Sequence, residues 1–101
     1  MSGRVIVVGG GLSGLSTAHT ILEQGGRVLV IDKSAFLGGN STKATSGING
    51  ALTQTQIKQG ITTDSKELFE QDAAKSAAAG VRPALVKVLT HGSGPAVEWL
   101  Q

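Results

Sequence analysis

Apolar residues near the start of the chain fall in two short continuous runs, the pattern of buried β-strands. The first run spans Val5 to Val8 and ends at a glycine-rich turn. The second spans Arg27 to Ile31, is rich in β-branched residues, and ends at Asp32. Between the runs, apolar residues recur at helical spacing and a glycine pair at 25–26 predicts the end of the helix. The pattern therefore predicts a strand, a helix and a second strand within residues 4–32, with an apolar helix face made of Leu15, Ala18 and Leu22.

The second half of the chain predicts helices and contains few groups that could carry chemistry. Residues 51–61 are polar without a clear period and predict a connecting loop. The next helix is expected to begin at Asp64 in a capping-box arrangement and to end at Gly80. Pro83 suits the first turn of a second helix, and Ser93 can cap a third. Spacing predicts that the inward-facing residues of these helices are Phe69, Ala73, Ala77, Leu85, Val88, Leu89, Val97 and Leu100.

Composition narrows the classes of function. The chain has 101 residues, 40% of them hydrophobic, and a formal net charge of +2. Its Lys and Arg residues are spread along the sequence and aromatic residues make up 3% of it, so neither a nucleic acid nor a membrane is the expected partner. The chain contains no cysteine, and its two histidines are far apart, so no metal site is expected. Without a signal segment, a cytoplasmic protein is the expectation.

The turn after the first apolar run carries the glycine spacing of a dinucleotide-binding site. Gly9 would let the backbone leave the strand sharply, and Gly11 would leave room for a pyrophosphate group. Gly14 would let the following helix pack closely on the strands. The N–H groups of the first helical turn, which includes Leu12 and Ser13, lack partners within the helix and form an anion site.

Asp32 stands where the second predicted strand ends. A carboxylate at this position accepts hydrogen bonds from a ribose diol and would repel a 2′-phosphate, which favours FAD or NAD over NADP. The glycine spacing alone is a weak signal in a chain with 15 glycines. A strand before it, a helix after it and an acid at the end of the next strand make the dinucleotide interpretation much stronger.

A second glycine pair, Gly38-Gly39, opens a segment of small polar residues that reaches Asn49. Glycine and small polar side chains let the backbone approach a flat ring system while they offer hydrogen-bond donors. The same residue types also form ordinary surface loops, so composition leaves both interpretations open.

From Val5 to Leu100 the chain resembles the N-terminal region of the fumarate reductase/succinate dehydrogenase flavoprotein family, most closely its soluble branch. The likeness rests on the segments VVGGGLSGLS, VLVIDK and GGNSTKATSGINGA, and on the spaced residues ELF and AVEWL. It implies an α/β fold in which a Rossmann-type FAD-binding βαβ unit (4–32) is followed by a flavin-binding loop (33–50) and a helical segment (64–101). With one βαβ unit and no further strand predicted, we expect residues 1–101 to be the N-terminal portion of an incomplete FAD-binding domain, without the substrate domain.

The resemblance also implies which residues contact the cofactor. FAD contacts are expected at Ser13, Asp32, Asn40, Ser41, Thr45 and Ser46, in addition to the glycine turn, Leu12, Gly39 and Gly47. Ser46 and Gly47 are also expected to border the site of a dicarboxylate substrate. Membrane-bound relatives attach FAD covalently through a histidine at the position of Asn40, so noncovalent FAD is expected here.

The reaction implied by the resemblance is the reduction of fumarate to succinate by hydride transfer from the flavin, with electrons from a reduced flavin or an NADH-linked donor. The arginines and histidines that act on the substrate in that family lie in later segments, so no catalytic residue is assigned in this chain. Two alternatives remain: another flavin enzyme of the same superfamily, such as a urocanate reductase or a ketosteroid dehydrogenase, or a short polypeptide that binds a nucleotide or a partner without turnover.

Overall fold

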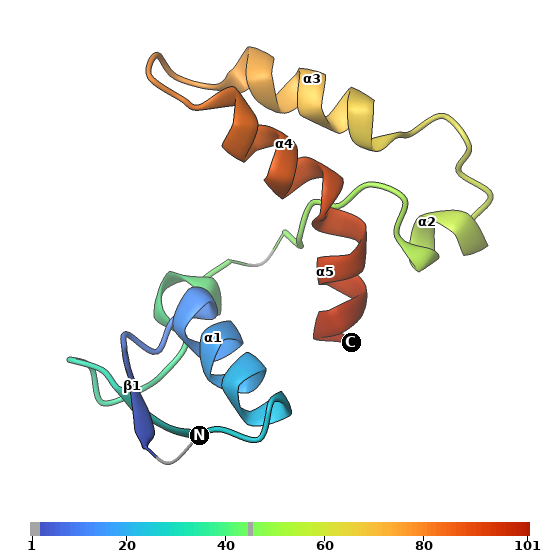
Figure 1. The fold of residues 1–101 in the computed structure, drawn as a ribbon. Helices are drawn as coiled ribbons and strands as arrows, with labels where there is room; N and C mark the ends of the chain where they lie inside the picture. The colour runs from blue at the N-terminus through green and yellow to red at the C-terminus, as the bar shows by residue number, and fades with distance from the viewer. Residues whose placement is uncertain (1–2, 45) are drawn as a thin grey trace. The chain divides into compact units, whose positions relative to one another are not determined.

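The computed structural model describes residues 3–44 and 46–101 and combines helices with a small parallel sheet (Figure 1). The chain divides into two compact units, Met1–Gly47 and Ile48–Gln101. The first unit holds both strands and the glycine-rich turns, and the second is built of helices.

The first unit is a strand, a helix and a parallel strand. Strand β1 (Arg4–Val8) pairs with β2 (Arg27–Ile31) in a register that sets Val7 opposite Val30. Helix α1 (Leu12–Glu23) contacts both strands, and the core lies between them, where Val7 and Ala18 are buried. The described residues contain no third strand, in agreement with the sequence prediction.

Only one face of the sheet is covered, which corrects the expectation of fully buried strands. Every second residue of each strand faces α1 and is buried or half-buried: Val5 and Val7 in β1, and Val28 and Val30 in β2. The opposite face consists of exposed apolar residues: Ile6, Val8, Leu29 and Ile31. A continuous apolar run does not by itself say whether a second layer is present.

Helix α1 ends as its glycine pair predicts. Gly25 has a φ of 77°, and its N–H donates to the carbonyl of Leu22, while the N–H of Gly26 donates to the carbonyl of Ile21. This pattern is the Schellman motif, which satisfies the last carbonyls of a helix. Leu22 itself is 53% exposed, so its assignment to the inward face was wrong, whereas Ala18 is correctly placed in the core.

The second unit contains a short helix where the sequence predicted a loop. Helix α2 (Gln54–Lys58) has a capping box, in which the Thr53 side chain accepts from the Gln56 N–H and the Gln56 side chain accepts from the Thr53 N–H. Gly60, with a φ of 73°, ends it through a second Schellman pair. A helix of five residues is too short for its apolar period to be visible.

The N-cap of helix α3 (Lys66–Ser76) lies one residue later than expected, and the helix ends earlier than expected. Its cap is Ser65, whose Oγ accepts from the N–H of Leu68 at 3.0 Å, and not Asp64. Asp64 instead accepts from the Gln56 side-chain amide at 2.6 Å. Because the helix stops at Ser76, Ala77 lies outside its apolar face, and Gly80 does not end the helix as predicted.

Helices α4 (Pro83–His91) and α5 (Ser93–Leu100) complete the second unit, with α4 running antiparallel to α3 (Figure 1). Pro83 occupies the first turn as predicted. The residues of α4 that were predicted to face inward are exposed: Leu85, Val88 and Leu89. Leu100, the last residue of α5, is exposed as well, so both inward assignments were wrong. None of the described helices has the length and apolarity that crossing a membrane would require.

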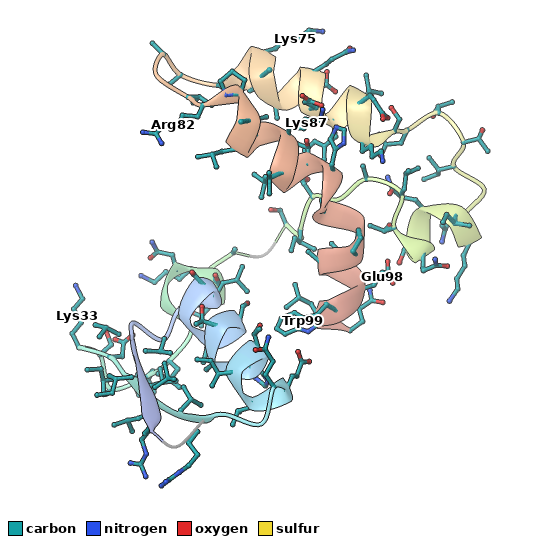
Figure 2. The ribbon with its side chains drawn as sticks, viewed as in Figure 1. Lys33, Lys75, Arg82, Lys87, Glu98 and Trp99 are labelled. Atoms are coloured by element: carbon teal, nitrogen blue, oxygen red, sulfur yellow. The ribbon has the colours of Figure 1, made fainter. Side chains whose placement is uncertain are left out.

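Ser93 does not cap α5 and serves as a bridge instead. Its Oγ donates to the Thr90 carbonyl at 2.7 Å and accepts from the N–H of Ala51 at 3.0 Å. A Cβ on Gly94 would lie 2.7 Å from the Ala51 carbonyl oxygen, so the backbone approaches closely here. Glu98, labelled in Figure 2, accepts from the N–H of Gln54 at 2.8 Å, which ties α5 to the start of α2.

Candidate cofactor-binding site

The glycine turn between β1 and α1 is shaped by two close backbone contacts. Gly9 has a φ of 103°, and its N–H donates to the Ile31 carbonyl at 2.7 Å, so the chain turns while it is still bound to β2. A Cβ on Gly14 would lie 1.7 Å from the Gly9 carbonyl oxygen and 3.4 Å from the Val7 side chain. Glycine at position 14 is therefore what allows α1 to lie directly on β1.

Gly11 differs from Gly14 because the space beside it is open. It is the N-cap residue of α1, with a φ of −80° that any residue adopts, and a Cβ there would meet no atom within 4 Å. No side chain caps the helix, and its first turn contains no acidic residue. The N–H groups of the first turn, including those of Leu12 and Ser13, thus have no acceptor within the helix and can bind an anion.

Asp32 is held at the end of β2 by two backbone hydrogen bonds. Its Oδ1 accepts from the N–H of Ser34 and its Oδ2 from the N–H of Gly10, each at 2.7 Å. These two bonds lower the pKa of Asp32 below 3.8, and the bond from Ser34 has the larger effect. The positive charge of Lys33 also lowers this pKa, whereas desolvation raises it. The carboxylate is ionised at neutral pH, and each oxygen keeps a lone pair for a further donor.

Two hollows meet at Asp32. One, of about 450 Å³, is lined by Val8, Gly9, Ile31, Asp32 and Lys33. The other, of about 690 Å³, extends along the following loop and its lining includes Gly39 and Asn40. Figure 2 shows Lys33 directly after β2, with its side chain directed away from α1. The structure therefore places Gly9, Asp32, Gly39 and Asn40, from three separate predicted segments, on two hollows that share Asp32 and Lys33.

The rest of the predicted loop contacts are more scattered. Ser41 lies in the 3-10 turn Gly39–Thr42 (η1) and is exposed. Ser46 and Gly47 are exposed as well, and these three are not among the described residues that line either hollow. Thr45 lies outside the described residues. The cofactor contacts assigned to these residues stay predictions.

Sequence reasoning missed two glycines that shape the site, Gly10 and Gly38. Gly10 donates to Asp32, and its carbonyl accepts from the N–H of Gly38 at 2.6 Å. Gly10 is buried, and a Cβ there would lie 2.3 Å from Leu37 Cδ2. The sequence did contain a signal for both residues, because Gly10 and Gly38 are each adjacent to a glycine that was assigned to the site.

Residues 4–101, which include all of these segments, match the FAD binding domain family. The chain belongs to the FAD-binding domain family. It is 50% identical over 97 residues to the fumarate reductase of Schizosaccharomyces pombe, covering 96% of this chain and 19% of that protein. It is 44% identical over 99 residues to fumarate reductase 1 of Saccharomyces cerevisiae, and this match covers 96% of this chain and 21% of that protein. A more distant relative, a urocanate reductase of Eggerthella lenta, is 31% identical over 96 residues, covering 95% and 16%.

The chain thus spans about a fifth of the length of the fumarate reductases that it matches. FAD is the cofactor of this FAD-binding domain, and the geometry of the first unit fits it in three respects. The space beside Gly11 is open, the start of α1 presents N–H groups without acceptors in the helix, and the ionised Asp32 retains acceptor capacity for a ribose.

Proposed function

We propose that this chain is the FAD-binding N-terminal portion of a fumarate reductase, with the first unit as a Rossmann-type βαβ unit and residues 33–50 as the flavin-binding loop. The observation that carries the proposal is the pairing of an open Gly11 with a close-packed Gly14, which is the arrangement of a dinucleotide-binding turn. The identity of 50% with a fumarate reductase along nearly the whole chain supports the choice of substrate.

The residues divide into three roles. The N–H groups at the start of α1, with Gly9 and Gly11, would hold the pyrophosphate, and Asp32 would hold the adenosine ribose. Gly39, Asn40 and the predicted contacts up to Gly47 would border the isoalloxazine ring. Bound FAD supplies two-electron chemistry to the site, while this chain's own residues bind and orient it.

Ser46 and Gly47 would border the dicarboxylate, fumarate or succinate. Groups that act on the substrate are not assigned in this chain, and an NADH-linked or reduced-flavin donor would supply the electrons. We also propose that the protein works without a membrane or nucleic-acid partner, in the cytoplasm.

The substrate assignment is tested with the native full-length protein. A chemically reduced dye should be reoxidised when fumarate is added, and one succinate should form for every two electrons that the dye loses. Maleate, the cis isomer, is the matched control because it carries the same charge in a different shape. Reoxidation by urocanate and not by fumarate would contradict the proposal and favour the second candidate, a urocanate reductase, which the relative of 31% identity suggests.

Noncovalent attachment is tested separately. Asn40 has an amide and no nucleophilic nitrogen, so it cannot form the histidyl bond of the membrane-bound relatives. Acid precipitation of the native protein should release the flavin into the supernatant. Flavin that stays with the precipitated polypeptide through washing would show a covalent bond, and peptide mapping would then locate it.

A further inference from the structure

One residue, Gly10, joins the three segments of the candidate site. The N–H of Gly10 donates to Asp32 Oδ2 at 2.7 Å, and the Gly10 carbonyl accepts from the N–H of Gly38 at 2.6 Å. Gly11 and Gly38 also form an isolated parallel β-bridge. At this one residue, the loop after β2 pairs with the glycine turn as a strand would. The turn, the Asp32 carboxylate and the loop are therefore connected through the N–H and the carbonyl of Gly10.

The contact around Gly38 leaves no room for side chains. Gly38 has a φ of 114°, and a Cβ on it would lie 2.2 Å from Thr42 Cγ2. Gly39 has a φ of 57°, and a Cβ on it would lie 3.3 Å from the Gly11 Cα. Glycine at position 39 lets the loop lie against the turn backbone to backbone, and glycine at position 38 lets the loop fold back close to Thr42.

From this contact we infer that Gly38 is a positioning residue, which holds the flavin-binding loop in register with the glycine turn and Asp32 through its bond to Gly10. The inference rests on the proposed FAD-binding function and adds a coupling element to it. Gly38 need not touch the cofactor, because its effect is to fix the spacing of the two half-sites.

The register matters because FAD is one molecule that contains both an ADP group and a flavin group, and each half-site binds one of them. When both half-sites are aligned, binding of the first group raises the effective concentration of the second to the millimolar range. That gain is lost if the geometry prevents simultaneous engagement, even when each half-site still binds its own group. A disturbed register should therefore weaken FAD far more than it weakens ADP or FMN alone.

The experiment uses the native full-length protein freed of flavin. Affinities for FAD and FMN are measured from flavin fluorescence and the affinity for ADP by competition, for wild type, Gly38→Ala and Gly25→Ala. Gly25 is the matched control, because its φ of 77° imposes a similar backbone strain while a Cβ there would meet no atom within 4 Å. We expect Gly38→Ala to lower FAD affinity by about ten-fold or more, with ADP and FMN changed by less than about two-fold. Gly25→Ala should leave all three affinities unchanged.

A second substitution isolates the steric cause. Thr42→Ser removes the Cγ2 that an alanine at 38 would strike, and it keeps the Oγ that donates to the Gly39 carbonyl at 2.9 Å. FAD affinity should recover in part in the double variant Gly38→Ala/Thr42→Ser. If Gly38→Ala does not fold, the double variant carries the comparison instead, because it keeps an alanine at the φ of 114° and lacks the contact with Thr42 Cγ2.

Two results would overturn the inference. Equal losses for FAD, FMN and ADP would mean that the contact only supports folding, and unchanged FAD affinity would mean that the loop keeps its register without it. A wild-type protein that binds no FAD would instead refute the proposed function, so the two failures are distinguishable.

Discussion

Replacing Gly14 with alanine should destabilise the first unit by forcing α1 off the sheet. The added Cβ would lie 1.7 Å from the Gly9 carbonyl oxygen. An ordinary carbon–oxygen contact needs about 3.3 Å, so the helix or the turn has to move by about 1.5 Å. A gap of that size removes most of the dispersion attraction between Val7 and Ala18 and their neighbours, and we expect a loss of about 3 kcal/mol in the free energy of unfolding.

Gly11→Ala is the contrasting variant, three positions earlier in the same turn. Its Cβ would meet no protein atom within 4 Å, and its φ of −80° suits alanine. The exchange of glycine for alanine at an N-cap should cost less than about 1 kcal/mol. Because the open space is where we propose the pyrophosphate binds, Gly11→Ala should nevertheless lose FAD.

The two variants are compared by thermal unfolding of the flavin-free protein and by flavin content after reconstitution. We expect Gly14→Ala to lower the Tm and Gly11→Ala to keep the Tm while it loses the flavin. The reasoning is refuted if Gly14→Ala unfolds at the wild-type temperature, since no backbone contact would then exist, or if Gly11→Ala retains full flavin content.

Two further predictions concern side chains. Asp32→Asn should weaken FAD binding by about ten-fold, measured by flavin fluorescence, because a neutral amide is a weaker acceptor for a ribose hydroxyl. The folded pKa of Asp32 is lowered, so its stabilisation is complete above its ordinary pKa of 3.8 and is lost as pH falls through the folded value; an acid unfolding profile should lose this component in Asp32→Asn. Ser93→Ala should lower the free energy of unfolding by about 1–3 kcal/mol in denaturant titration, because the N–H of Ala51 loses its acceptor in a buried site. Ser76→Ala, which removes an exposed bond to a helix carbonyl, is the control and should change it by less than about 0.5 kcal/mol.

Local sequence was enough to predict the order of a strand, a helix and a second strand in the first unit. Glycine spacing marks the turn at Gly9, the C-terminus of α1 at Gly25 and the close contact at Gly14, because each demands a backbone conformation or an approach that other residues resist. The position of Asp32 follows from the end of β2. These features depend on neighbours along the chain, so a single sequence contains their signal.

Contacts between distant segments were not predictable in this way. The bonds from Gly10 to Asp32 and from Gly38 to Gly10 join residues that no local pattern relates, and so does the bond from Ala51 to Ser93. Sequence reasoning assigned the Asp32 carboxylate to a ribose alone, whereas two backbone N–H groups already hold it in place. A local motif identifies a chemical group but leaves its other partners unknown.

Helix α4 shows the separate limit of periodicity. Leu85, Val88 and Leu89 do share a face, as their spacing predicts, yet they are 61%, 72% and 71% exposed. The covered face carries Val86, which is half-buried, and Thr90, which is 1% exposed. Thr90 can be buried because its Oγ1 donates to the Val86 carbonyl at 2.9 Å and needs no partner from another helix. A helical period therefore states which residues lie together, and only the neighbouring elements decide which face is covered.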